Sequence, residues 1–171
     1  MQINVMRTAL AMLLLLGLAA CGTSSGPQAL SPHRPQLGEP ISCVPYARAR
    51  SGIQLQGDAW QWWDAASGRY ERGRTPQAGS VLVIARSSRN PSGHLAVVSR
   101  VVNSREIQVD HANWASGAAR GRIATDQRVV DVSAANNWTL VRVWYPPVND
   151  LGNTAYPARG FVHGATRYAS R

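Results

Sequence analysis

The sequence contains no lysine, and only nine acidic residues stand against its eighteen arginines. The formal net charge is therefore +9, which favours polyanionic partners such as nucleic acid, acidic lipid or an anionic cell wall. The arginines are scattered, and no basic block interleaved with aromatic residues is present, so we expect no nucleic-acid partner. The chain has 171 residues, of which 44% are apolar, which is enough for one buried core and short for two domains.

A long hydrophobic run is absent as well. The apolar residues 9–20, which follow Arg7, are fewer than the roughly 20 that a membrane-spanning helix needs. This pattern predicts that residues 1–20 form a signal peptide for export. The run ends in Leu-Ala-Ala-Cys-Gly, which resembles the lipobox of bacterial lipoproteins, where the signal is cut before the cysteine and the cysteine, here Cys21, is acylated. The alternative is an ordinary signal with an incidental cysteine.

A lipid on Cys21 would decide where the mature protein resides. Each buried methylene contributes about 0.8 kcal/mol, so several acyl chains hold a protein on a membrane. The next residue, Gly22, is not the aspartate that resembles an inner-membrane retention signal. We therefore expect an outer-membrane lipoprotein that faces the periplasm in a host with two membranes. Residues 21–38, which contain few apolar side chains, then form the lipidated cysteine and a flexible tether.

Cysteine is scarce, with two in the whole chain. If Cys21 carries lipid, Cys43 has no disulfide partner in an oxidising compartment. Ser42 suits a helix cap and Pro45 a first helical turn, so Cys43 is predicted at the start of a helix. Free N–H groups at such a terminus favour a thiolate, which makes Cys43 a candidate nucleophile. The alternative is a small buried hydrophobic residue.

Three strands are predicted in the middle of the chain. The apolar run 81–85 suits a central strand, and residues 94–102 suit a second strand that is apolar on both faces. Residues 106–111 alternate, so that His111 points inward and Asp110 points outward. His94 is the first residue of the second strand, and this places both histidines on neighbouring strands.

The turn at residues 103–104 predicts how these strands pair. A two-residue turn there places Ala96 opposite His111 and His94 opposite Asn113. Directly opposed side chains have Cβ atoms about 5 Å apart and diagonal ones about 7 Å apart, so the three polar side chains would form one cluster. A slip of one residue would separate them.

A cysteine on a helix, a histidine on a strand and a polar group on the next strand fit the logic of a catalytic triad. The histidine takes the thiol proton, and the third group fixes the orientation of the histidine. The backbone N–H of Cys43 is a natural oxyanion donor, typically worth about 3 kcal/mol. A zinc site of Cys43, His94 and His111 is the other chemical interpretation. The close-spaced ligand pairs usual for zinc are absent, so we predict no metal and no cofactor.

Four motifs resemble the CHAP family, the cysteine, histidine-dependent amidohydrolases and peptidases, within the papain-like and NlpC-type group. The motifs are SCVPYAR at 42–48, PQAGSV at 76–81, GHLAVV at 93–98 and IQVDHANW at 107–114. The resemblance implies an α+β papain-like fold, with N-terminal helices packed on an antiparallel sheet of about five strands, over residues 39–147. Residues 148–171 lack periodicity and are rich in glycine and proline, so we expect a mobile C-terminal tail there.

The resemblance also implies roles for individual residues. Cys43 would be the nucleophile, and His94 the general base and then the acid. Many family members have a glutamate, a spacer, an asparagine and a tryptophan where this chain has His111, Ala112, Asn113 and Trp114. A histidine at the third position resembles the NlpC-type branch. Either His111 or Asn113 would then orient His94, and we favour His111.

The implied function is hydrolysis of an amide bond in peptidoglycan, either an N-acetylmuramoyl-L-alanine bond or a peptide crosslink. Trp114 would wall the cleft, and Arg86 and Arg89 would meet acidic groups of the stem peptide. The alternatives for these three residues are plain packing and a solvated loop. We expect a monomer whose partners are peptidoglycan and, through the lipid, a membrane. The rival functions are an amidase for small peptide-like amides and a non-catalytic lipoprotein that binds or scaffolds the wall.

Overall fold

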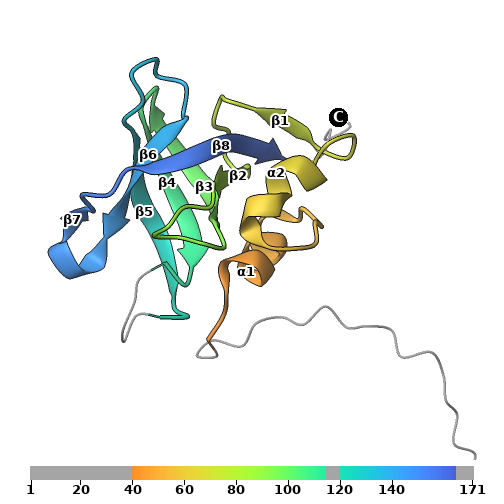
Figure 1. The fold of residues 1–171 in the computed structure, drawn as a ribbon, viewed down its shortest axis with the longest axis horizontal. Coiled ribbons are helices and arrows are strands. Elements are labelled where there is room, and N and C mark those ends of the chain that lie inside the picture. Colours follow the sequence, from red (N-terminus) through yellow and green to blue (C-terminus); the bar gives the residue numbers. More distant parts are fainter. Residues whose placement is uncertain (1–39, 115–119, 165–171) are drawn as a thin grey trace, which may run out of the picture. The chain divides into compact units, whose positions relative to one another are not determined.

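Six antiparallel strands close into a barrel in the computed structural model, which describes residues 40–114 and 120–164 (Figure 1). The ring closes because β8 pairs with β2 on one side and with β6 on the other. The barrel strands are β2 (Val81–Ile84), β3 (His94–Asn103), β4 (Glu106–Ala112), β5 (Ile123–Asp131), β6 (Leu140–Tyr145) and β8 (Tyr156–His163). The predicted signal and tether, with Cys21, lie outside the described residues.

Short elements decorate this barrel. Strand β1 (Glu71–Gly73) pairs with β8, and β7 (Asp150–Leu151) pairs with β6. The helical elements are α1 (Cys43–Ser51), η1 (Ala59–Gln61), α2 (Trp62–Ala65) and η3 (Pro146–Val148). Figure 1 shows α1 and α2 on one side of the barrel and β7 on the opposite side. None of the helices in the described ranges has the length and apolar character needed to cross a membrane.

The predicted α+β papain-like fold is wrong. Among the described residues 42% are in strands and 16% in helices, and the sheet is a closed barrel with extra strands rather than a layer of about five strands under helices. The error comes from the C-terminal segment, because the expected mobile tail contains the strand that closes the ring. Pro157 and Gly160 interrupt its pattern, yet Phe161 and Val162 are fully buried. Residues 165–171 lie outside the described part.

Side chains of β2 and of the first five residues of β3 are buried on both faces, as their continuous apolar sequence predicts, whereas the end of β3 is exposed. Alternate residues such as Leu82 and Ala96 fill the barrel interior together with Phe161. The residues between them, such as Val83 and Leu95, pack outward against α1 and the η1–α2 segment. The two central strands predicted from the sequence are thus confirmed.

The outer face of β4 is covered as well. Asp110, predicted to point outward, is only 4% exposed because α1 packs over it. Its carboxylate pairs with Arg50 Nε at 2.9 Å and accepts a hydrogen bond from the Asp126 N–H at 3.0 Å. This ion pair ties the last turn of α1 to the barrel. Alternation along a strand predicts which side chains share a face, but not whether a helix covers that face.

The β3–β4 hairpin reaches the predicted register by an unexpected route. The turn is one residue later than predicted, since Asn103 pairs with Glu106. Two irregularities between there and Val98 then correct the register, and Val97 pairs with Asp110. The predicted pairing is therefore wrong at the turn and confirmed next to the histidines.

Candidate active site

Two buried histidines meet at one end of the barrel. His94 Nε2 and His111 Nδ1 are 3.1 Å apart, and the two side chains are 4% and 1% exposed. Burial, and next to it the charge of His111, holds the pKa of His94 well below its usual value. Burial lowers the pKa of His111 to about 4, although the nearby carboxylate of Asp110 opposes this. Both rings are therefore neutral near pH 7, one donating a proton to the hydrogen bond and the other accepting it.

The indole ring of Trp114 packs on both histidines. Its centroid lies 4.7 Å from that of His94 and 5.8 Å from that of His111, with the second pair nearly parallel. On its other side Trp114 meets Tyr156 edge-on at 5.0 Å. The indole thus covers the histidine pair and is itself half-buried.

Asn113 leaves the predicted cluster. Its backbone has a φ of 61°, a left-handed conformation that asparagine tolerates better than most residues. Its side chain is exposed and accepts a hydrogen bond from the Gly121 N–H at 2.8 Å, instead of reaching His94. Of the two candidates for orienting His94, only His111 makes the contact.

Cys43 is the first residue of α1, as predicted, and Gly52 ends the helix with a φ of 77°. The predicted cap, Ser42, makes no side-chain hydrogen bond to the helix. Burial raises the pKa of the Cys43 thiol, and this effect exceeds the opposing one of backbone N–H groups, among them that of Leu95. The N–H donors expected at a helix start are present, but desolvation outweighs them and the resting group is a thiol.

Cys43 packs against the cluster that contains Leu95, the residue that follows His94. No hydrogen bond joins Cys43 Sγ to the His94 ring within the described residues. The pairing with His111 uses His94 Nε2, which leaves Nδ1 as the nitrogen available to another group. The structure therefore brings together the two histidines and Trp114, and it packs Cys43 against a cluster that includes Leu95, the neighbour of His94 on β3.

The segment that carries these residues is similar to a known protein family. Residues 35–113 match the CHAP domain family. This segment of the chain is similar to CHAP domains. Proteins with this domain are generally amidase-type or peptidase-type hydrolases and often act on peptidoglycan. No curated protein matches the chain. The match includes Cys43, His94 and His111 and ends one residue before Trp114.

A groove of about 520 Å³ begins at Trp114 and continues beyond the matched CHAP segment. Its lining residues are Arg89, Trp114, Val143, Tyr145, Val148, Gly152, Asn153, Thr154 and Tyr156. Sequence reasoning missed Tyr156 and β7 because residues 148–171 had been assigned to a tail, and it did not single out Tyr145, which lies within the predicted domain. Of the two predicted arginines, Arg89 lines the groove. The guanidinium of Arg86 instead lies over the Trp60 ring, 5.0 Å from its centroid.

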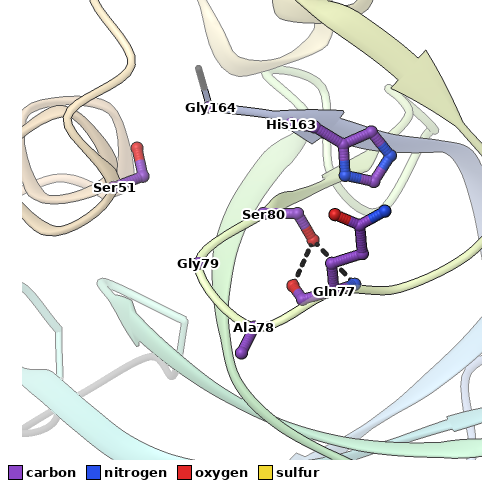
Figure 2. A pocket seen from close by; sticks show the side chains of 7 residues that line it. All are labelled: Ser51, Gln77, Ala78, Gly79, Ser80, His163 and Gly164. Atoms are coloured by element: carbon purple, nitrogen blue, oxygen red, sulfur yellow. Dashed lines mark hydrogen bonds between the residues drawn. The ribbon is translucent and has the colours of Figure 1, made fainter. Parts of the chain in front are cut away.

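A second, smaller pocket of about 210 Å³ lies around His163 (Figure 2). The Ser80 hydroxyl donates to the Gln77 carbonyl at 2.6 Å beside it, and the Nδ1 atom of His163 is buried without a partner among the described residues. Ser51, at the last turn of α1, completes the wall, whereas Cys43 starts that helix about 12 Å away along its axis. His94 and His111 do not line this pocket.

Metal binding has no obvious centre in residues 40–114 and 120–164. No group of three or more His, Cys, Asp or Glu side chains there is placed to hold an ion. Cys43, His94 and His111, considered above for zinc, are therefore not such a group in these ranges.

Proposed function

We propose that this protein is a thiol-dependent amide hydrolase of peptidoglycan, with Cys43 as the nucleophile and His94 as the base. The observation that carries the proposal is the buried His94–His111 hydrogen bond under Trp114, within the segment that matches the CHAP family. A hydrogen-bonded imidazole pair next to a thiol is what a cysteine hydrolase needs to move a proton.

Opposite pKa shifts indicate the order of events. Burial raises the pKa of Cys43 and lowers that of His94, so a neutral thiol and a neutral imidazole are favoured over an ion pair. His94 therefore removes the thiol proton as sulfur attacks the amide carbonyl, rather than beforehand. The backbone N–H groups of Cys43, Val44 and Leu95 oppose the rise in the pKa of the thiol, and they favour the negative charge on sulfur as its proton leaves.

The remaining steps follow from this proton transfer. The new S–C bond gives a tetrahedral intermediate, and the protonated His94 donates its proton to the departing amine as the C–N bond breaks. Water then attacks the thioester with His94 as base, releasing the carboxylic acid and restoring the thiol. His111 keeps the ring of His94 in place through both steps, as a positioning residue. Hydrogen bonds between catalytic groups are often long before substrate binds, which accounts for the unbonded thiol.

We also propose that the protein works in the cell envelope as a monomer, anchored through lipid on Cys21. The export signal and lipobox-like sequence support the anchor, and the net charge of +9 suits an anionic wall. Such an anchor would keep the hydrolase close to its polymeric substrate.

The proposal is tested by incubating the protein with isolated sacculi and measuring soluble peptide release. We expect Cys43→Ala and His94→Ala to lower the rate by roughly 1,000-fold or more. His163→Ala removes a buried histidine outside the site and serves as the matched control, which should retain activity. Equal release by all four proteins would refute thiol catalysis.

A non-catalytic wall-binding module is the second candidate, favoured by the raised pKa of the Cys43 thiol and the missing Cys43–His94 hydrogen bond. Sacculus binding without any peptide release would support it. Hydrolysis of small peptide amides but not of sacculi would instead indicate an amidase for soluble substrates.

A further inference from the structure

We propose that the groove along β6, β7 and β8 binds a carboxylate-bearing peptide segment of the substrate, with Arg89 as the partner of the carboxylate. This inference rests on the proposed function, since it assigns the part of the substrate beside the amide that Cys43 attacks. The groove lies almost entirely outside the segment that matches the CHAP family, so the match says nothing about its occupant.

Trp114 connects the groove to the chemistry. Its ring contacts His94 and His111, and the same residue lines the groove together with Tyr156. A substrate that occupies the groove therefore lies against the indole that covers the histidine pair. A volume of about 520 Å³ lies within the usual range of roughly 300–1,000 Å³ for sites that hold small ligands.

The charge of the groove comes from one side chain. Arg89 is the only charged residue among those lining it, and it is exposed. Its guanidinium makes no hydrogen bond or ion pair with any described residue, whereas the nearby Arg86 already lies over Trp60. An arginine fork pairs with a carboxylate through two parallel hydrogen bonds. An anionic segment would provide Arg89 with a partner that the described chain does not supply.

The far wall of the groove is held in place before any ligand arrives. The guanidinium of Arg142 on β6 donates to the carbonyls of Gly152 at 2.7 Å and Leu151 at 3.3 Å, and to Asn153 Oδ1 at 3.4 Å. The Gly152 N–H also donates to the Val143 carbonyl at 3.0 Å. These bonds use the oxygen of the Asn153 amide and leave its NH₂ for a ligand. A wall fixed in this way binds with little ordering cost.

The aromatic and apolar lining complements this charge. Tyr145 and Tyr156 provide flat surfaces on which a peptide backbone or an apolar side chain can pack. A neutral sugar ring could use the same rings, and it is the competing occupant. The two are distinguished by whether affinity depends on the charge of the ligand and on Arg89.

The test uses the full chain and two synthetic peptides that differ only in a glutamate side chain, which is either free or amidated. We expect KM for the free acid to be at least tenfold lower than for the amide, and Arg89→Gln to abolish that ratio. Arg86→Gln removes an equal charge from the same loop outside the groove, and should keep the ratio. Equal KM values for both peptides, or a ratio unchanged in Arg89→Gln, would overturn the proposal and favour the sugar.

A binding measurement separates this inference from the proposed function. Calorimetric titration of the Cys43→Ala chain with the same two peptides reports the groove without catalysis. If the chain binds the free acid more tightly and this preference disappears when Arg89→Gln is added, the proposed role of the groove is supported even without any hydrolysis. If both peptides are hydrolysed and neither assay shows a preference, the proposed hydrolase function stands and the assignment of Arg89 as the carboxylate partner is refuted.

Discussion

The two halves of the chain around the barrel contribute different parts of the structure. The segment up to Asn113 supplies the thiol and both histidines, and it is the part that matches the CHAP family. The segment from 120 to 163 supplies β8, which closes the barrel, and most of the groove. The proposed catalytic residues thus lie on a helix and a local hairpin, whereas closure and the proposed substrate contacts come from distant strands. Trp114 stands at the junction and touches both.

The largest effect is expected on stability, and it tests whether the first half of the barrel depends on β8. Phe161 is fully buried inside the barrel and packs edge-on against Trp138 at 5.5 Å. We expect Phe161→Ala to lower the free energy of unfolding by about 3–5 kcal/mol, measured by urea denaturation. Val101→Ala, at a position that is 41% exposed, is the control and should stay within about 0.5 kcal/mol. A small effect of Phe161→Ala would mean that the first half is stable without β8.

Sequence reasoning succeeded where the signal is local. The apolar runs gave β2 and β3, and strand alternation brought His94 and His111 together despite a misplaced turn. It failed for β8, because Pro157 and Gly160 break the periodicity and the strand is recognisable only from the partners β2 and β6, which are far away in the chain. The groove was not predicted either, because its lining residues come together only when β8 closes the barrel.

Protonation of His111 offers the next test, and this residue belongs to the first half. The pKa of His111 is about 4 in the folded protein and about 6.5 when unfolded. Below pH 6.5 the unfolded chain binds more protons, so stability is complete above that pH and falls as the pH drops towards 4. The expected loss from this residue is roughly 3 kcal/mol by pH 4, measured by urea denaturation. His111→Gln should flatten the pH dependence; an unchanged slope would place its origin elsewhere.

Thiol activation shows a second limit of sequence reasoning. Ser42 and Pro45 predicted the helix start at Cys43, and the helix is there. The consequence expected for the thiol does not follow, because its pKa depends on burial by β3 and not only on the helix terminus. The burial of Asp110 under α1 has the same cause. Packing between α1 and the barrel strands determines both the pKa of Cys43 and the burial of Asp110. The sequence of one element alone does not predict that packing.

The choice of orienting group gives a smaller effect within the active site. Because His111 bonds to His94, we expect His111→Ala to lower kcat by roughly 100-fold in the sacculus assay. Asn113→Gly keeps the left-handed backbone and removes the side chain, and should change kcat by less than about threefold. The reverse order of the two effects would return the orienting role to Asn113.

The smallest effect is expected in the second half, where it sharpens the division of labour. Arg142 lies outside the histidine pair and holds the groove wall through Gly152 and Leu151. Arg142→Met keeps the aliphatic stem but removes these bonds, so the wall loosens and KM for the acidic peptide rises by roughly fivefold, while kcat changes little. Lost stability alone would lower the active fraction and leave KM unchanged. A fall in kcat at constant KM, with the folded fraction unchanged, would instead show that β7 supports the chemistry, and the two halves would not be separable.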